Sequence, residues 1–283
     1  MRIKTFTTLL SILLATSCVK KIELELPDYA SKLVVNGEMD SESKISLQVS
    51  RSLPIMQTSD SSGYLIKNAV VTVFENGSNI GTATYFNGRF ELPQKPKPGF
   101  RYRIEVASGT YIPVTANLVM PDKTPVTVTY TDSIGLDGFG FKIGQINLSF
   151  TDNGSISNYY KLLINYYNAG RQEWLPLLLS SNDVIFLNNE KLNDGSYLFS
   201  DRTFSGKTKR LSFEVPFGFA TGSPKFAVIL KNFDADYYDY LRATDDYTQT
   251  GNGFSNDPVI LKSNVTNGLG MVGGVSNARD TIY

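Results

Sequence analysis

Apolar and polar residues alternate through most of this chain, and short turn signals separate the alternating stretches. Tyr102, Ile104 and Val106 alternate in one stretch, and Asn76-Gly77 and Asn87-Gly88 lie beside others. Asn-Gly pairs supply the positive backbone angles that two-residue β-hairpin turns require. Alternation with a period of two, broken by turns every 8–12 residues or so, is typical of β-sandwiches. The chain is therefore predicted to be all-β.

The stretches fall into two groups, which predicts two tandem β-sandwich-like domains. Residues 30–121 carry about seven expected strands, as in immunoglobulin-like or transthyretin-like domains. The polar segment Pro121–Pro125 is flanked by prolines and marks the predicted boundary. Residues 122–283 then form a C-terminal β domain. Its expected strands are 126–130, 141–150, 159–167, 184–187, 197–200, 211–215 and 226–230, with closing strands within 264–275.

One segment of the second domain breaks the β pattern. Phe233, Tyr237, Tyr240 and Leu241 recur at the spacing of one helical face. Asp234 precedes them and is a favourable N-cap residue, because its carboxylate accepts hydrogen bonds from free backbone N–H groups. A helix is predicted near 235–247.

Residues 1–17 are expected to be a lipoprotein signal peptide. A basic start is followed by an apolar stretch that is too short to span a bilayer. The stretch ends in Leu14–Cys18, which resembles a bacterial lipobox, although Ala15 occupies the place where leucine is preferred. Cys18 is the one cysteine of the chain, so lipidation is expected there, with 18–29 as the lipid-anchored tether. The alternative is an ordinary secretory signal with an incidental cysteine.

Charge and composition exclude several classes of function. Lys plus Arg and Asp plus Glu number 27 each, whereas a nucleic-acid-binding protein shows a basic excess. Without any histidine, the chain lacks the base of Ser-His-Asp and Cys-His triads and the commonest zinc ligand. A single cysteine excludes disulfide frameworks and cysteine-rich metal sites. We expect no cofactor and no metal, and a non-enzymatic protein; a hydrolase that uses carboxylates alone remains a third hypothesis.

Exposed aromatic side chains are the candidate contact residues. In the strand predicted over 159–167, one face is apolar and expected in the core, while the other is mixed and carries Tyr159 and Tyr167. Trp174 follows within the segment Glu173–Pro176. Tyr and Trp are enriched at interfaces, so Tyr159, Tyr167 and Trp174 are predicted to form a partner or ligand surface. A partly covered sheet face, and a packed loop position for Trp174, are the alternatives.

The chain resembles a known family in the motifs Lys32–Gly37, Ala69–Val73, Tyr102–Val106, Tyr237–Leu241 and Asn264–Gly270. It is similar to the Bacteroidota lipoproteins grouped as domain of unknown function four-two-four-nine. The resemblance implies a two-part β protein at the outer membrane, and such proteins are typically encoded beside TonB-dependent receptors. The family brings no catalytic residues with it.

The leading hypothesis is an accessory lipoprotein of a TonB-dependent nutrient uptake system. It would be anchored in the outer membrane through Cys18, with the cell-surface and periplasmic faces both open. A stand-alone surface module that binds glycan or peptide is the alternative, and a purely structural envelope role also survives. Asp132-Ser133-Ile134 and Asp280-Thr281-Ile282 resemble the short O-glycosylation motif of Bacteroidota, and their use is left open.

Overall fold

The computed structural model describes residues 30–54, 63–179, 181, 183–186, 192, 194–216, 225–250 and 261–282. Residues 31–283 form one compact unit. The predicted signal peptide over 1–17, Cys18 and the tether over 18–29 lie outside the described residues. Among the helices that are described, none is long and apolar enough to cross a membrane.

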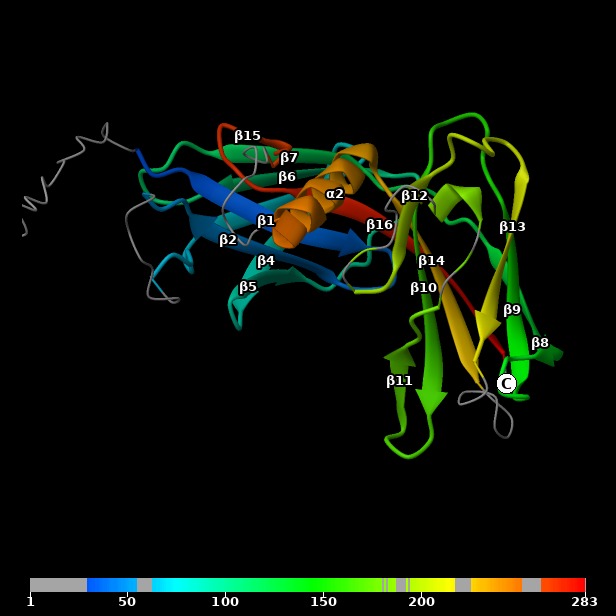
Figure 1. Ribbon diagram of the computed structural model, residues 1–283. Coiled ribbons are helices and arrows are strands. Elements are labelled where there is room, and N and C mark those ends of the chain that lie inside the picture. Colours follow the sequence, from blue (N-terminus) through cyan, green and yellow to red (C-terminus); the bar gives the residue numbers. More distant parts are fainter. Residues whose placement is uncertain are drawn as a thin grey trace, which may run out of the picture. The chain divides into compact units, whose positions relative to one another are not determined.

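The described part of the chain consists of strands and one α-helix (Figure 1), which confirms the predicted all-β class with a short helix. The elements are β1 (Leu33–Asp40), β2 (Ile45–Arg51), β3 (Val70–Glu75), β4 (Ser78–Phe86), β5 (Arg89–Leu92), β6 (Arg101–Ala107), β7 (Val114–Val119), β8 (Val126–Leu136), β9 (Lys142–Thr151), β10 (Tyr159–Asn168), β11 (Glu173–Pro176), the 3-10 helix η1 (Val184–Phe186), β12 (Tyr197–Ser200), β13 (Thr208–Val215), β14 (Phe226–Phe233), α2 (Ala235–Thr250), β15 (Val265–Thr266) and β16 (Val272–Ile282).

The strands form two sheets. The larger sheet has thirteen strands in the order β11-β10-β14-β16-β1-β2-β5-β4-β3-β6-β7-β15, with β12 also paired to β10. The smaller sheet has the order β13-β9-β8. Asn76-Gly77 and Asn87-Gly88 lie between β3, β4 and β5 with positive φ at all four residues, so the turns predicted at both Asn-Gly pairs are confirmed.

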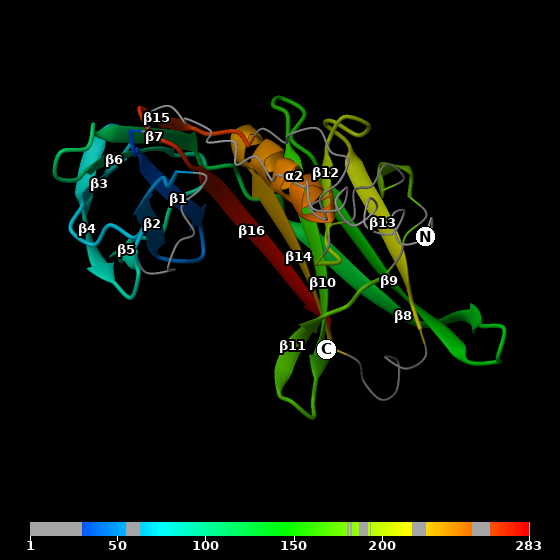
Figure 2. The same ribbon diagram turned by 60° about the vertical axis from the view of Figure 1, so that its left-hand side comes forward.

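A first hydrophobic core lies among the strands β1 to β7, which Figure 2 shows gathered together. Its side chains come from alternate strand positions, such as Val71 and Val73 of β3 and Tyr102, Ile104 and Val106 of β6, all at most 2% exposed. Alternation places one face of each strand in this core and the other toward solvent. Two residues from the far end of the sequence, Val265 and Val272, belong to the same core.

A second core lies between the two sheets and gives this half of the chain its β-sandwich arrangement. Ile146, Leu148 and Phe150 of β9 enter it from the small sheet, and Tyr160 and Leu162 of β10 enter it from the large sheet. Both side-chain rows are at most 2% exposed. The face of β10 predicted to lie in the core therefore does so, and the other face of β10 is turned away from it.

β16 belongs to both halves of the large sheet. Its first residues, Val272–Val275, pair in parallel with Gly37–Asp40 of β1. The rest of the strand pairs antiparallel with β14, in a register that joins Val275 to Phe233 and Ile282 to Phe226. The closing segment predicted within 264–275 thus continues as a strand to residue 282.

Helix α2 begins at the predicted residue and ends three residues later than predicted. Asp234 caps it, because its Oδ1 accepts a hydrogen bond from the backbone N–H of Tyr237 at 2.9 Å. Tyr238 packs with Leu198, Phe233 and Val275 in a small third cluster. The helix therefore covers part of the large sheet on the side that the second core does not use.

The strand predicted over 184–187 is wrong, because Val184–Phe186 form the 3-10 helix η1. The carbonyl of Asp183 accepts from the N–H of Phe186 at 3.0 Å, and its Oδ1 accepts from the N–H of Ile185 at 3.1 Å. An aspartate that offers two local acceptors favours a tight turn over an extended strand. Ile185 and Phe186 are still buried.

Candidate binding surface

The predicted contact residues occupy two separate places on β10. Tyr167 pairs across the β10–β11 hairpin with Trp174, and their ring centroids lie 5.4 Å apart at an edge-to-face angle of 60°. Tyr159 lies eight residues earlier on the same strand, about 26 Å away at the usual rise per residue. Its ring contacts Tyr238 of α2 at 4.7 Å between centroids. The structure therefore brings Tyr167 and Trp174 together and separates Tyr159 from them.

Two cationic side chains flank the Tyr167–Trp174 pair. The guanidinium of Arg279 on β16 lies 5.0 Å from the Trp174 ring centroid. The ammonium of Lys225, just before β14, lies 5.7 Å from the Tyr167 ring centroid. Cations over aromatic faces interact favourably with the ring quadrupole. We call Tyr167, Trp174, Lys225 and Arg279 the aromatic–cation patch.

The sequence prediction missed both cations of this patch. Lys225 directly precedes a predicted strand, and Arg279 follows the point where the closing strand was expected to end. The strand pairing of β16 with β14 carries Arg279 onto the same outer face as Ile229, its cross-strand partner. Extending the alternation past residue 275 was the sequence signal that places Arg279 on a strand.

A groove of about 620 Å³ adjoins the patch, and Arg279 belongs to both. Asn277 in this groove donates from Nδ2 to Asp40 at 2.7 Å, while its buried Oδ1 has no hydrogen-bond partner among the described residues. Lys123 and Glu42 form an ion pair at the groove wall. The groove is therefore lined by charges of both signs, and Arg279 connects it to the indole of Trp174. A few polar groups beside an aromatic ring are typical of sites that bind polar ligands.

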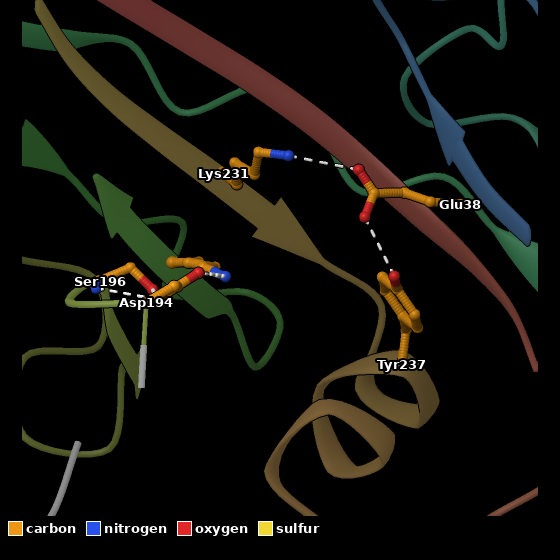
Figure 3. A network of polar contacts seen from close by, with 6 residues as sticks. Glu38, Asp194, Ser196, Lys231 and Tyr237 are labelled. Carbon is orange, nitrogen blue, oxygen red and sulfur yellow. Dashed lines mark hydrogen bonds and ion pairs between the residues drawn. The ribbon is translucent and has the colours of Figure 1, made fainter. Parts of the chain in front are cut away.

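A polar network joins β1, β14 and α2 (Figure 3). Glu38 Oε1 accepts from Lys231 Nζ at 3.2 Å, and its Oε2 accepts from the hydroxyl of Tyr237 at 3.0 Å. Burial, followed by the charge and hydrogen bond of Glu38, raises the pKa of Tyr237 far above its usual range. The phenol therefore stays protonated and acts as a donor, which suits a structural contact and not a nucleophile.

Lys161 lies directly opposite Lys231 in the pairing of β10 with β14. Like charges at directly opposed positions repel each other. Here Lys161 has its own partner, because its Nζ lies 2.8 Å from Asp194 Oδ2. Asp194 also accepts from the backbone N–H of Ser196 at 3.0 Å. Its burial raises the pKa of Asp194, but the hydrogen bonds from Lys161 and Ser196 outweigh this and leave the pKa below its ordinary value.

A second groove of about 630 Å³ lies between β6, β7 and the start of α2. Arg101 and Arg103 line it together with Asp236. Arg103 is paired with Glu105 and lies over the ring of Phe74 at 3.9 Å. The groove has charges of both signs, and most of them already have partners within the chain.

The buried carboxylates of the second core are held by structural donors. Asp152 is 5% exposed and accepts from the hydroxyl of Tyr160 at 2.6 Å and from the N–H of Gly206 at 2.8 Å. On α2, Asp236 and Asp239 share one cation, Lys262, whose Nζ lies 2.7 and 3.0 Å from their carboxylate oxygens. Across the described ranges, no three His, Cys, Asp or Glu side chains gather closely enough to hold a metal ion.

Residues 19–281 match the model of a family described as Domain of unknown function (DUF4249). No curated protein matches the chain. Among solved structures, the Clostridium thermocellum CbhA fibronectin(III)-like modules are similar, with 9% identity and a TM-score of 0.25, over 73% of this chain and 87% of that one. Salmonella alpha-2-macroglobulin reacted with methylamine is similar with 11% identity and a TM-score of 0.22, over 94% of this chain and 15% of that one. For Escherichia coli alpha-2-macroglobulin the identity is 9% and the TM-score 0.21, over 73% of this chain and 19% of that one.

Proposed function

The chain belongs to the DUF4249 family, and we propose that it is a non-enzymatic accessory lipoprotein of a TonB-dependent nutrient uptake system. Residues 14–18 support lipid anchoring, because the one cysteine of the chain follows small residues at the end of an apolar stretch. Several acyl chains on one cysteine anchor a protein stably, whereas one chain binds only marginally. The protein would then be held at the outer membrane through Cys18.

The aromatic–cation patch supports the proposal that the chain binds a partner protein. Trp174 and Arg279 belong to the residue types that most often dominate binding energy at protein interfaces. The patch is held by cross-strand pairing between β10 and β11, so little order has to be gained when a partner binds.

Lipid anchoring would strengthen the binding of a partner through the patch. A protein tethered to the same membrane as its partner meets it at a high effective concentration, so modest contacts suffice for a lasting complex. The chain would act by position and contact: the anchor keeps it beside a transporter barrel, and the aromatic–cation patch engages the barrel.

The proposal is tested by affinity purification of the full-length lipoprotein from mildly solubilised outer membrane. We expect a TonB-dependent barrel to co-purify in stoichiometric amount with the wild type. Trp174→Ala is expected to reduce the recovered barrel about tenfold, as for an interface residue worth about 1.4 kcal/mol. Phe86→Ala is the control, because Phe86 on β4 is a 66% exposed aromatic outside the patch.

Recovery of the wild-type protein without any barrel would refute the accessory role. Equal loss of barrel for Trp174→Ala and Phe86→Ala would refute the assignment to the patch. Circular dichroism of each variant shows whether the fold is intact.

The groove beside the patch favours a second candidate, a stand-alone module that binds glycan or peptide. Glu42, Lys123 and Arg279 line this groove with charges of both signs, and Trp174 with Arg279 offers an aromatic surface at its edge. A chain starting at residue 19 should then bind glycans or peptides directly, and Trp174→Ala should weaken this binding. If the chain binds no such ligand and a barrel is recovered with it, the accessory role is supported over the stand-alone module.

A further inference from the structure

The tip of the β8–β9 hairpin, residues 131–142, exposes a row of large apolar side chains. Phe139 is 88% exposed and Leu136 is 65% exposed, and Ile134 and Phe141 are exposed as well. Single exposed apolar residues are ordinary on protein surfaces, whereas a contiguous group marks a contact site. The backbone around it is open too, because a Cβ added at Gly135, Gly138 or Gly140 would meet no atom within 4 Å.

Hydrogen bonds within the tip hold it in one conformation. Asp137 Oδ1 accepts from the N–H of Phe139 at 2.8 Å and from the N–H of Phe141 at 2.9 Å. Its own N–H donates to the carbonyl of Phe141 at 2.8 Å, and Gly140 adopts φ +85°. The turn is therefore organised before any contact is made, which reduces the entropic cost of docking the Phe139 ring.

The tip lies at the same end of the sandwich as the β10–β11 hairpin. β8 and β10 both run toward this end, and both views of the chain place the two turns there. The chain connection agrees with this, because β13 ends and β14 begins there and Phe226 of β14 pairs with Tyr166 near the end of β10. The tip and the β10–β11 turn therefore project from the same end of the sandwich, one from each sheet.

The charges of the tip indicate what kind of partner it binds. Asp132 and Asp137 face one cation, Lys142, which lies 3.1 Å from Asp132, so two carboxylates and one ammonium give a formal charge of −1. Anionic lipid surfaces attract basic segments, and insertion of Phe139 would carry Asp137 into the interface. A second copy of the chain is also a poor fit, because charged side chains line both the groove of about 620 Å³ and the groove of about 630 Å³.

We propose that Phe139 inserts into an apolar pocket of a partner protein, with basic groups at the pocket rim opposite Asp132 and Asp137. The proposal rests on the accessory function above, and it takes the barrel of that function as the partner. Leu136 and Ile134 pack around the pocket entrance, and Asp137 keeps the ring projected by holding the turn.

The test combines a substitution with site-specific crosslinking in the full-length lipoprotein. Phe139→Asp is compared with Phe86→Asp for recovery of the barrel from mildly solubilised outer membrane. Separately, p-benzoyl-phenylalanine is placed at position 139 or at position 86 and irradiated in the membrane. Position 86 is the control because it too carries an exposed phenylalanine, but on β4 of the large sheet and away from the tip.

We expect Phe139→Asp to reduce barrel recovery at least tenfold, Phe86→Asp to leave it unchanged, and position 139 alone to crosslink to the barrel. Equal barrel recovery for wild type and Phe139→Asp overturns the inference and leaves the accessory function standing. A crosslink from position 139 to phospholipid or to a second copy of the chain overturns it as well. If the wild type recovers no barrel, the accessory function fails and the inference fails with it.

Discussion

At the scale of single residues, Tyr160 and Asp152 form a buried hydrogen-bonded pair in the second core. The Tyr160 side chain is fully buried, and its hydroxyl is one of the two donors that hold the Asp152 carboxylate. Burial, with the hydrogen bond to Asp152, raises the pKa of Tyr160 far above its usual range. The phenol therefore donates throughout the neutral pH range.

Tyr160→Phe should lower the free energy of unfolding by about 1–3 kcal/mol, because it leaves a buried carboxylate oxygen without its donor. The ring still fills its place beside Phe150, so packing is unchanged. Urea denaturation measures the change. Tyr85→Phe is the control, since the Tyr85 hydroxyl makes no hydrogen bond within the described residues; its effect should stay within about 0.5 kcal/mol. Equal effects of the two substitutions would contradict the account.

Of the two residues in this contact, the sequence predicted the position of Tyr160 but not that of Asp152. Alternation along 159–167 placed Tyr160 on the core face, as the structure has it. Asp152 gave no comparable signal, because its partners come from β10 and from the turn at Gly206. The same limit applies to the aromatic–cation patch: Tyr167 and Trp174 were predicted as contact residues, but Arg279 reaches Trp174 only through the pairing of β16 with β14.

At the scale of elements, helix α2 depends on Asp234 in two ways. One carboxylate oxygen caps the helix through the N–H of Tyr237, and the other accepts from the N–H of Gly274 on β16. Asp234→Ala should therefore cost more than a cap alone, whose loss typically costs about 1 kcal/mol. We expect about 2 kcal/mol in urea denaturation, with loss of helical signal in circular dichroism.

Asp236→Asn is the matched control in the same helical turn. Asp236 is half exposed and pairs with Lys262, and exposed ion pairs contribute about 0–1 kcal/mol. A cost for Asp236→Asn as large as that for Asp234→Ala would show that general charge, and not the cap, supports the helix.

Element prediction succeeded where local chemistry decides the conformation. Asn76-Gly77 and the Asp234 cap are local signals, and both were predicted from the sequence. The strand expected at 184–187 failed for a local reason as well: a short apolar run does not distinguish a strand from a helical turn, and Asp183 favours the turn. The hairpin at Asn76-Gly77 was predicted, but pairings between strands distant in the sequence, such as β1 with β16, were not, because no local signal marks them.

At the scale of the whole molecule, the large sheet connects two hydrophobic cores through β16. Val272 belongs to the first core, while Ala278 and Ile282 of the same strand pack against the second. Two tandem domains were predicted with a boundary at residue 121. Because the two cores share β16, we expect them to unfold together in a single cooperative transition.

A substitution at Gly270 tests whether the two cores unfold together. Gly270 precedes β16 with φ +110°, and a Cβ there would overlap the carbonyl oxygen of Val35 on β1. Gly270→Ala should cost about 1–3 kcal/mol through backbone strain and this clash. Gly109→Ala is the control, because Gly109 also has a positive φ, of +51°, but open space around it, so its cost should be smaller.

Two reporters then follow the two cores during urea unfolding. Trp174 is the sole tryptophan, so its fluorescence reports on the second half, and hydrogen exchange of β6 peptides reports on the first. We expect coincident midpoints in the wild type and an equal shift of both in Gly270→Ala, because β16 transmits the loss at β1 to β14. If Gly270→Ala shifts only the β6 transition and leaves the Trp174 transition in place, the two cores are independently stable, and the predicted division into tandem domains describes the folding of the chain better than the shared sheet does.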